Sequence, residues 1–87
     1  MHISVITPEE EYFQGKIESV KVPGTSGEFQ VLKGHAPIVS SLVEGKVEIR
    51  QEGGKTMSFQ IVGGFVEVLD DAVALLVNGI TNSSKPQ

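Results

Sequence analysis

Short runs in which apolar residues alternate with other residues set the strongest limit on how this chain can fold. A period of two places successive side chains on opposite faces of a β-strand. Turn-forming residues, mainly glycine, proline and aspartate, separate the runs at intervals of roughly 8 to 12 residues, which is typical of a small β-sandwich or barrel. We therefore predict an all-β fold. The clearest alternating runs are 3–5, 20–22, 29–31, 47–49 and 59–61.

Two hairpins are predicted in more detail than the other elements. In the first, Gly53 and Gly54 stand at the reversal and supply the positive φ angles that a tight turn demands. In the second, Asp70 and Asp71 form the turn. The predicted strand pairs are 46–51 with 56–62, and 65–69 with 72–77.

The domain organisation follows from length and local composition. A chain of 87 residues builds one hydrophobic core, so residues 1–80 are expected to form a single β-sandwich domain. Residues 81–87 are polar and carry no apolar anchor, and we expect a disordered tail there. No segment sustains an apolar period of 3.6, so at most a single helical turn is expected, near 36–42.

Charge and composition narrow the range of partners. The net charge is −4 and the basic residues are scattered singly, which argues against binding to nucleic acid or to an anionic membrane surface. No apolar run approaches the roughly 20 residues of a spanning helix, and the N-terminus shows no signal-peptide pattern. Any association with a membrane is therefore expected to run through a partner.

Two strands are predicted to be apolar on both faces. Residues 65–69 and 73–77 do not alternate, whereas a two-layer sandwich normally leaves one face of each sheet wet. The outward apolar side chains must be covered. Either the segment around Tyr12 and Phe13 covers them, or another protein does, and the sequence leaves both alternatives open.

The sequence holds no convincing constellation of residues for catalysis or for ligand binding. Gly54-Lys55-Thr56 lacks the first glycine and the strand-to-helix context of a phosphate-binding loop. His2 and His35, with no cysteine in the chain, do not have zinc-site spacing. His35 is interpreted as a structural turn residue, because no acid, base or nucleophile accompanies it. We expect no enzyme activity, no metal and no cofactor.

Seven short motifs follow one another from about residue 3 to residue 77, and their order is more specific than any one of them. They are Val5-Ile6-Thr7-Pro8-Glu9, Phe13-x-Gly15, Val20-x-Val22-Pro23-Gly24, Gly27-Glu28-Phe29, Gly34-His35-Ala36-Pro37-Ile38, Leu42-x-x-Gly45-x-Val47-x-Ile49 and Gly63-Gly64-Phe65-Val66-Glu67-Val68. In this order they resemble the N-terminal domain of the epsilon subunit of the F-type ATP synthase. The resemblance implies a flattened β-sandwich of two five-stranded, mostly antiparallel sheets.

The resemblance also implies a function and a set of contact residues. In that family the domain is a rotor part of the central stalk, which joins the gamma subunit to the membrane ring of c subunits within the whole synthase. The c-ring contact is expected at Ser26, Gly27 and Glu28. The gamma contact is expected at Thr7, His35 and Ser40, and the outward apolar strands add Leu76 and Val77 to that expectation. No homo-oligomer is expected.

The sequence departs from the family in two respects. The family usually continues into a pair of C-terminal helices that inhibits ATP hydrolysis, and this sequence is expected to lack both the helical hairpin and that inhibition. Gln30 and Lys33 stand where the family often has glycine and proline, so the resemblance fixes the fold but not the detailed loop conformation around Glu28.

Two readings of function remain after the resemblance is weighed. The favoured one is a non-catalytic rotor subunit, peripheral on the cytoplasmic face of a bacterial inner membrane, although a processed organellar protein would have a similar sequence. The alternative is a free-standing β-sandwich module that binds a peptide or a small ligand. Binding of gamma in one-to-one stoichiometry distinguishes the first from the second.

Overall fold

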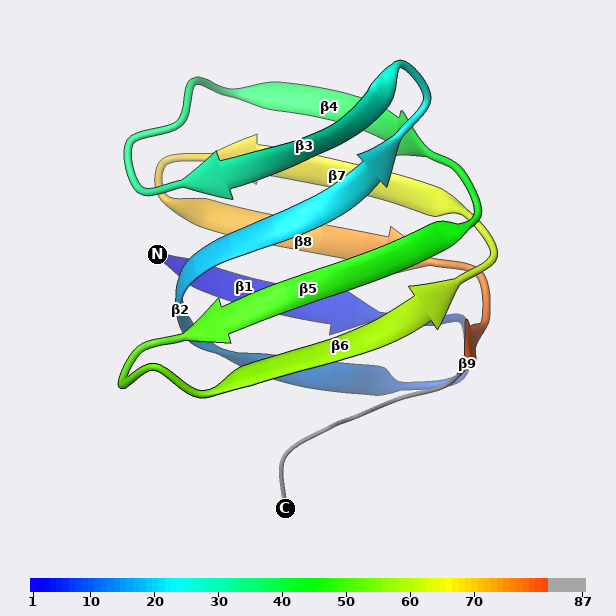
Figure 1. The fold of residues 1–87 in the computed structure, drawn as a ribbon, viewed down its shortest axis with the longest axis horizontal. Coiled ribbons are helices and arrows are strands. Elements are labelled where there is room, and N and C mark those ends of the chain that lie inside the picture. Colours follow the sequence, from blue (N-terminus) through cyan, green and yellow to red (C-terminus); the bar gives the residue numbers. More distant parts are fainter. Residues whose placement is uncertain (82–87) are drawn as a thin grey trace.

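The computed structural model describes residues 1–81, which form nine strands joined by turns and short loops (Figure 1). The predicted all-β fold is confirmed. Along the chain the strands are β1 (His2–Ile6), β2 (Glu11–Gly24), β3 (Gly27–Leu32), β4 (Ile38–Leu42), β5 (Gly45–Gln51), β6 (Thr56–Ile61), β7 (Gly64–Leu69), β8 (Ala72–Val77) and β9 (Ile80–Thr81).

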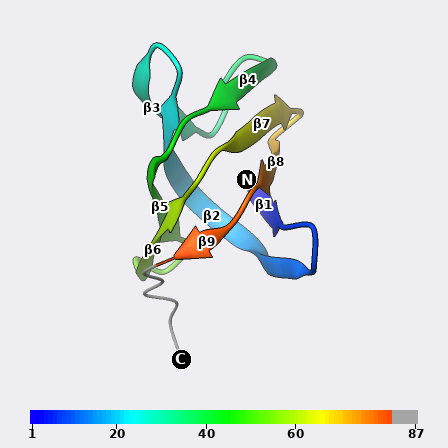
Figure 2. The ribbon, with the colours of Figure 1, turned by 90° about the vertical axis from the view of Figure 1, so that its right-hand side faces the viewer.

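The strands lie in two layers that share β2 (Figure 2). The first half of β2 pairs with β1, and the order continues through β8 and β7 to β4. The second half of β2 pairs with β3 and β5, and β6 and β9 extend that layer. Counted in both layers, β2 makes each a five-stranded sheet, as the resemblance implied. All pairings are antiparallel except that of β1 with β8. We call the layer of β4, β7, β8 and β1 the first sheet and the other the second sheet.

A bulge in β2 accompanies its passage from one sheet to the other. The pairing register between β2 and β5 shifts between Ile17 and Ser19. An extra residue in one strand bends that strand and increases its twist. Residues before the bulge pair with β1 and residues after it pair with β3, so the bend lies where the strand changes layer.

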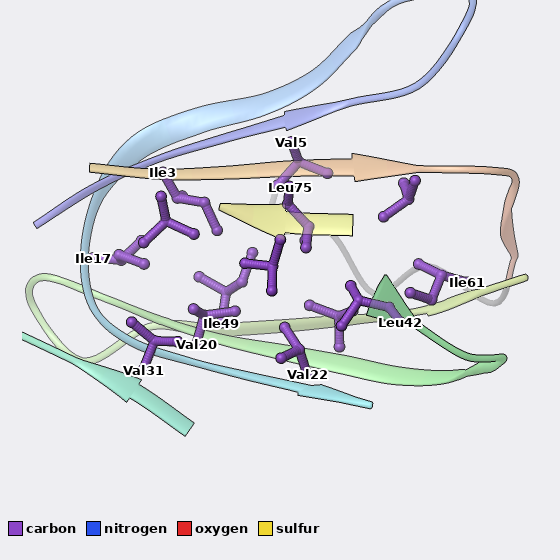
Figure 3. Packing of buried hydrophobic residues seen from close by; sticks show 14 of the residues in the cluster. Ile3, Val5, Ile17, Val20, Val22, Val31, Leu42, Ile49, Ile61 and Leu75 are labelled. Atoms are coloured by element: carbon purple, nitrogen blue, oxygen red, sulfur yellow. The ribbon is translucent and has the colours of Figure 1, made fainter. Parts of the chain in front are cut away.

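The core fills the space between the two sheets (Figure 3). Side chains of Val5 and Leu75 from the first sheet meet those of Val20 and Ile49 from the second, and all four are almost fully buried. The buried apolar cluster consists of Ile3, Val5, Ile17, Val20, Val22, Val31, Leu42, Val47, Ile49, Met57, Phe59, Ile61, Val66, Val68, Val73, Leu75 and Val77. Burial of a Val, Leu or Ile side chain contributes about 1.5–3 kcal/mol, so this cluster is the main source of stability.

Tyr12 and Phe13 face this core rather than the outside of the first sheet. The Tyr12 ring meets the Phe59 ring edge-on, with centroids 5.3 Å apart. Phe13 is paired with the buried Val5 and packs against the same cluster. The proposal that this segment covers the outward apolar side chains is therefore wrong.

Both predicted hairpins are confirmed, and the single helical turn that the sequence allowed near 36–42 does not form. Ile38–Leu42 is instead the strand β4, which pairs with β7 along its length. Pro37 has no N–H to donate within a helix, and the β-branched Ile38 and Val39 favour a strand. Thr81, assigned to the tail from the sequence, belongs to β9. The rest of the predicted tail, 82–87, lies outside the described residues.

Across residues 1–81, the structure contains no helix with the length and hydropathy needed to cross a membrane.

Candidate docking face

The outer surfaces of the two sheets differ sharply in polarity. On the second sheet, charged side chains cover the surface and partly pair with each other. Arg50 donates to Glu18 at 2.9 Å, and Lys46 lies 3.7 Å from Glu48. Such exposed pairs stabilise the fold by only about 0–1 kcal/mol.

The outer surface of the first sheet is largely apolar along β7 and β8. Phe65 and Leu76 are direct cross-strand partners with 54% and 45% of their surfaces exposed, and Ile6 lies beside Leu76 on the next strand. Val39 is 71% exposed. We call the outward apolar side chains of this sheet the apolar face; they are Ile6, Val39, Phe65, Leu69, Ala72, Ala74 and Leu76. A contiguous exposed apolar surface of this kind is a candidate contact surface for another molecule.

Two shallow hollows lie at opposite ends of the apolar face. The first has a volume of about 280 Å³, and the second about 260 Å³. Ile6, Thr7, Pro8, Gly64, Phe65, Leu76, Val77 and Asn78 line the first hollow. Pro37, Ile38, Val39, Glu67, Val68 and Leu69 line the second. Both are walled mainly by apolar atoms, so each suits a side chain of a docked protein.

His35 is held in its turn by hydrogen bonds to nearby backbone. The backbone N–H of His35 donates a hydrogen bond to the backbone carbonyl of Leu32 at 3.0 Å. Its Nδ1 lies 2.7 Å from the Ala36 carbonyl oxygen, and because a carbonyl only accepts, Nδ1 carries a proton. The structural role predicted for His35 in the turn is thus confirmed, while its contact with a partner stays a prediction.

Of the other predicted gamma contacts, Thr7 borders the apolar face and Ser40 does not. Thr7 lines the first hollow together with Leu76, and its hydroxyl donates to the Glu10 carbonyl at 3.2 Å. Ser40 is half-buried, lies opposite the buried Val66 and donates to the Ser41 carbonyl at 3.3 Å, so it belongs to the inner side of β4.

Val77 requires a correction. Only 2% of its surface is exposed, because it shares the inward side of β8 with Val73 and Leu75. Its side chain is part of the core and is not available on the apolar face. Leu76, its neighbour, points outward.

The predicted c-ring residues occupy the hairpin that joins β2 and β3. Ser26, Gly27 and Glu28 are all exposed there, and Gly27 adopts a φ of 124°. Glu28 lies within β3 opposite Pro23 rather than in a loop. This hairpin and the loop of His35 lie at opposite ends of the sandwich, to the right and left in Figure 1.

Sequence reasoning missed several residues of the face: Ile6, Val39, Phe65, Glu67 and Leu69. The strand of Phe65, Glu67 and Leu69 was identified as apolar on both sides, but such a pattern gives no signal for which residues point outward. Ile6 and Val39 lie on β1 and β4, which were not identified as apolar on both sides.

Within the described part of the chain, no three His, Asp or Glu side chains are grouped closely enough to hold a metal ion.

Comparison with known proteins identifies relatives that share both sequence and fold. The epsilon chain of the ATP synthase of Chlorobaculum tepidum is 42% identical over 79 residues, which are 91% of this chain and 90% of the relative. That of Leptospira borgpetersenii is 41% identical over 78 residues, 90% of this chain but 61% of the relative. The curated relatives therefore include chains of similar length and considerably longer ones.

Solved structures agree with the fold. A chain in the Euglena gracilis mitochondrial ATP synthase, in a structure of OSCP, F1 and c-ring, superposes with a TM-score of 0.79 at 29% identity, covering 93% of this chain and 50% of that chain. A chain from the central stalk and c-ring of the Tetrahymena thermophila enzyme gives a TM-score of 0.79 at 18% identity, covering 92% and 64%. The second likeness concerns the fold alone.

The sequence model of one family matches residues 1–83, and its description is "ATP synthase, Delta/Epsilon chain, beta-sandwich domain". Together with relatives above 40% identity that align with nine-tenths of the sequence, this match shows that the chain belongs to the delta/epsilon-chain family of the ATP synthase, as its β-sandwich domain.

Proposed function

We propose that this chain is a non-catalytic rotor part of the central stalk of an F-type ATP synthase, where it joins the gamma subunit to the c-subunit ring. Family membership supports the placement in the synthase, and the similar chains of known structure come from an OSCP, F1 and c-ring assembly and from a central stalk and c-ring assembly. The observation that carries the proposal is the apolar face of the first sheet, which contrasts with the charged outer surface of the second.

The magnitude of the forces decides which surface holds gamma. An exposed ion pair contributes about 0.2–1 kcal/mol, too little for a joint that transmits torque. Burial of about 400 Å² of apolar surface contributes on the order of 10 kcal/mol before the entropy lost on association. Gamma therefore binds the apolar face, with Phe65 and Leu76 near the centre of the contact.

This placement accounts for predicted contacts at both ends of the sandwich. Thr7 lines the first hollow, and Pro37, two residues after His35, lines the second. A gamma surface that spans the face reaches both ends. Ser40 and Val77 contribute from the inner side of their strands, as support for the face rather than as contacts.

The exposed hairpin of Ser26, Gly27 and Glu28 is the c-ring contact in this proposal. It projects from the end of the sandwich away from His35, so gamma and the ring are engaged by different parts of the domain. Glu28 adjusts how the domain sits on the ring and does not anchor it. The chain is peripheral, reaches the membrane through these partners and, in a bacterium, lies on the cytoplasmic side.

Size-exclusion chromatography of this chain with separately produced gamma from the same source tests the proposal. A one-to-one complex, weakened by His35→Ala, is the expected result. If folded gamma and folded chain at micromolar concentration elute separately, the rotor proposal fails and a free-standing binding module becomes the better account.

A further inference from the structure

A single carboxylate, that of Glu67, lies in the middle of the apolar face. Its cross-strand partners are Val39 on β4 and Ala74 on β8, and its neighbours on the same side of β7 are Phe65 and Leu69. Glu67 is exposed, and its side chain takes part in no ion pair or hydrogen bond with any residue in 1–81. The charge of Glu67 therefore has no partner within the part of the chain that the structure describes.

Glu67 also lines the second hollow, whose other walls are apolar. Pro37, Val39 and Leu69 contribute much of the wall, and among residues 1–81 Glu67 is the only charged one that borders the space of about 260 Å³. Lysine and arginine combine a long aliphatic stem with a cationic end, and the stem packs well on apolar surface. The chemistry of the hollow thus fits a basic side chain.

Burial of the face changes the balance of forces at Glu67. A carboxylate removed from water is strongly unfavourable unless an opposite charge or hydrogen-bond donors replace the lost solvent. A partner that covers Phe65 and Leu69 must also cover Glu67, which lies between them.

We propose that the gamma subunit presents an arginine or lysine to this hollow, with its stem against Val39 and Leu69 and its cation paired with Glu67. This inference rests on the proposed function and names the chemistry of the partner surface. Glu67 is then a specificity residue: a surface with an apolar or acidic side chain at this point would leave its carboxylate unpaired and be rejected.

The test compares Glu67→Gln and Glu67→Lys with Glu52→Lys, a control with the same charge change in the exposed turn between β5 and β6. Each full-length variant is titrated with gamma, and its thermal unfolding is recorded to verify the fold. Glu67→Lys is expected to raise Kd at least about 30-fold and Glu67→Gln about 5-fold or more, whereas Glu52→Lys stays within about 2-fold.

The outcomes separate this inference from the proposed function. If the wild-type chain forms no complex with gamma, the proposed function fails, and the inference fails with it. If the complex forms and Glu67→Gln binds as tightly as the wild type, no cation faces Glu67 and the inference alone is wrong. Equal weakening by Glu67→Lys and Glu52→Lys also contradicts it, because only net charge would then matter.

Discussion

The backbone N–H of Gly34 donates a 3.1 Å hydrogen bond to Oδ1 of Asp71, although 37 positions separate the two residues in the sequence. The bond ties the loop between β3 and β4 to the turn between β7 and β8. Asp70 and Asp71 both adopt positive φ angles, 50° and 63°, in that turn. The loop of His35 is therefore fixed at one end of the apolar face by a side chain from the neighbouring hairpin.

Asp71→Ala is expected to lower the free energy of unfolding by about 1–2 kcal/mol. The substitution removes the hydrogen bond and places a residue with a β-carbon and no local polar group in the left-handed region. Urea denaturation measures the loss, and amide exchange at Gly34 reports on the bond itself. Asp71→Asn keeps the acceptor and tolerates the positive φ, so it should match the wild type. Unchanged protection of the Gly34 amide in Asp71→Ala would show that the bond does not hold the loop.

Gly64→Ala is expected to destabilise the fold by about 3 kcal/mol or more. A β-carbon at Gly64, where φ is 149°, would overlap the Leu76 carbonyl oxygen and lie 2.8 Å from Cα of Val77. The adjacent Gly63→Ala is the control, since its β-carbon would stand 3.5 Å from the Leu42 carbonyl oxygen, an ordinary contact. The denaturation midpoints of the two variants measure the difference in their stability. Similar stability for both would mean that β7 and β8 separate easily at this point.

The sequence predicts the elements whose signals are local. Gly53-Gly54 and Asp70-Asp71 mark their hairpins because the turns need positive φ, which glycine adopts freely and aspartate tolerates. The sharing of β2 by two sheets was not predicted, because it depends on a bulge near Glu18 and on pairing with distant strands. Tertiary pairing with β7 likewise decided the conformation of 38–42.

The candidate site was predicted only at the level of strands. Val73, Leu75 and Val77 follow one side of β8, and Ala74 and Leu76 follow the other. Both sets are apolar, so hydrophobicity cannot indicate which set faces the core, and Val77 was wrongly placed outside. That Glu67 is a single charge within an exposed apolar surface can be recognised only when Phe65 and Leu69 are known to be exposed beside it.

Leu76→Asp is expected to fold normally and to raise the Kd for gamma at least about 10-fold. The residue is already 45% exposed, so a carboxylate is tolerated in the free chain but loses its water in the complex. Titration with gamma measures the change. Thr56→Asp adds the same charge to an exposed strand position on the second sheet and should leave binding unchanged. If the two variants bind gamma equally well, the apolar face is not the contact.

Glu28→Gln is expected to change binding to the c-ring by about 5-fold or less and to leave gamma binding unchanged. An exposed charge pair contributes no more than about 1 kcal/mol, which corresponds to this factor. Titration of the assembled stalk with purified c-ring gives the first value, and titration of the isolated chain with gamma gives the second. Complete loss of c-ring binding would mean that Glu28 is an anchor, contrary to the distributed attachment argued here.

Protection of the apolar face by gamma is the most direct test of the account. The chain contains no cysteine, so Leu76→Cys and Thr56→Cys each introduce a single thiol, one on the outer surface of each sheet. Labelling of each thiol by a maleimide is timed with and without a cysteine-free gamma subunit. We predict that gamma slows labelling at position 76 at least ten-fold and leaves position 56 within two-fold. Equal labelling at position 76 in the free chain and in the complex would contradict the central claim.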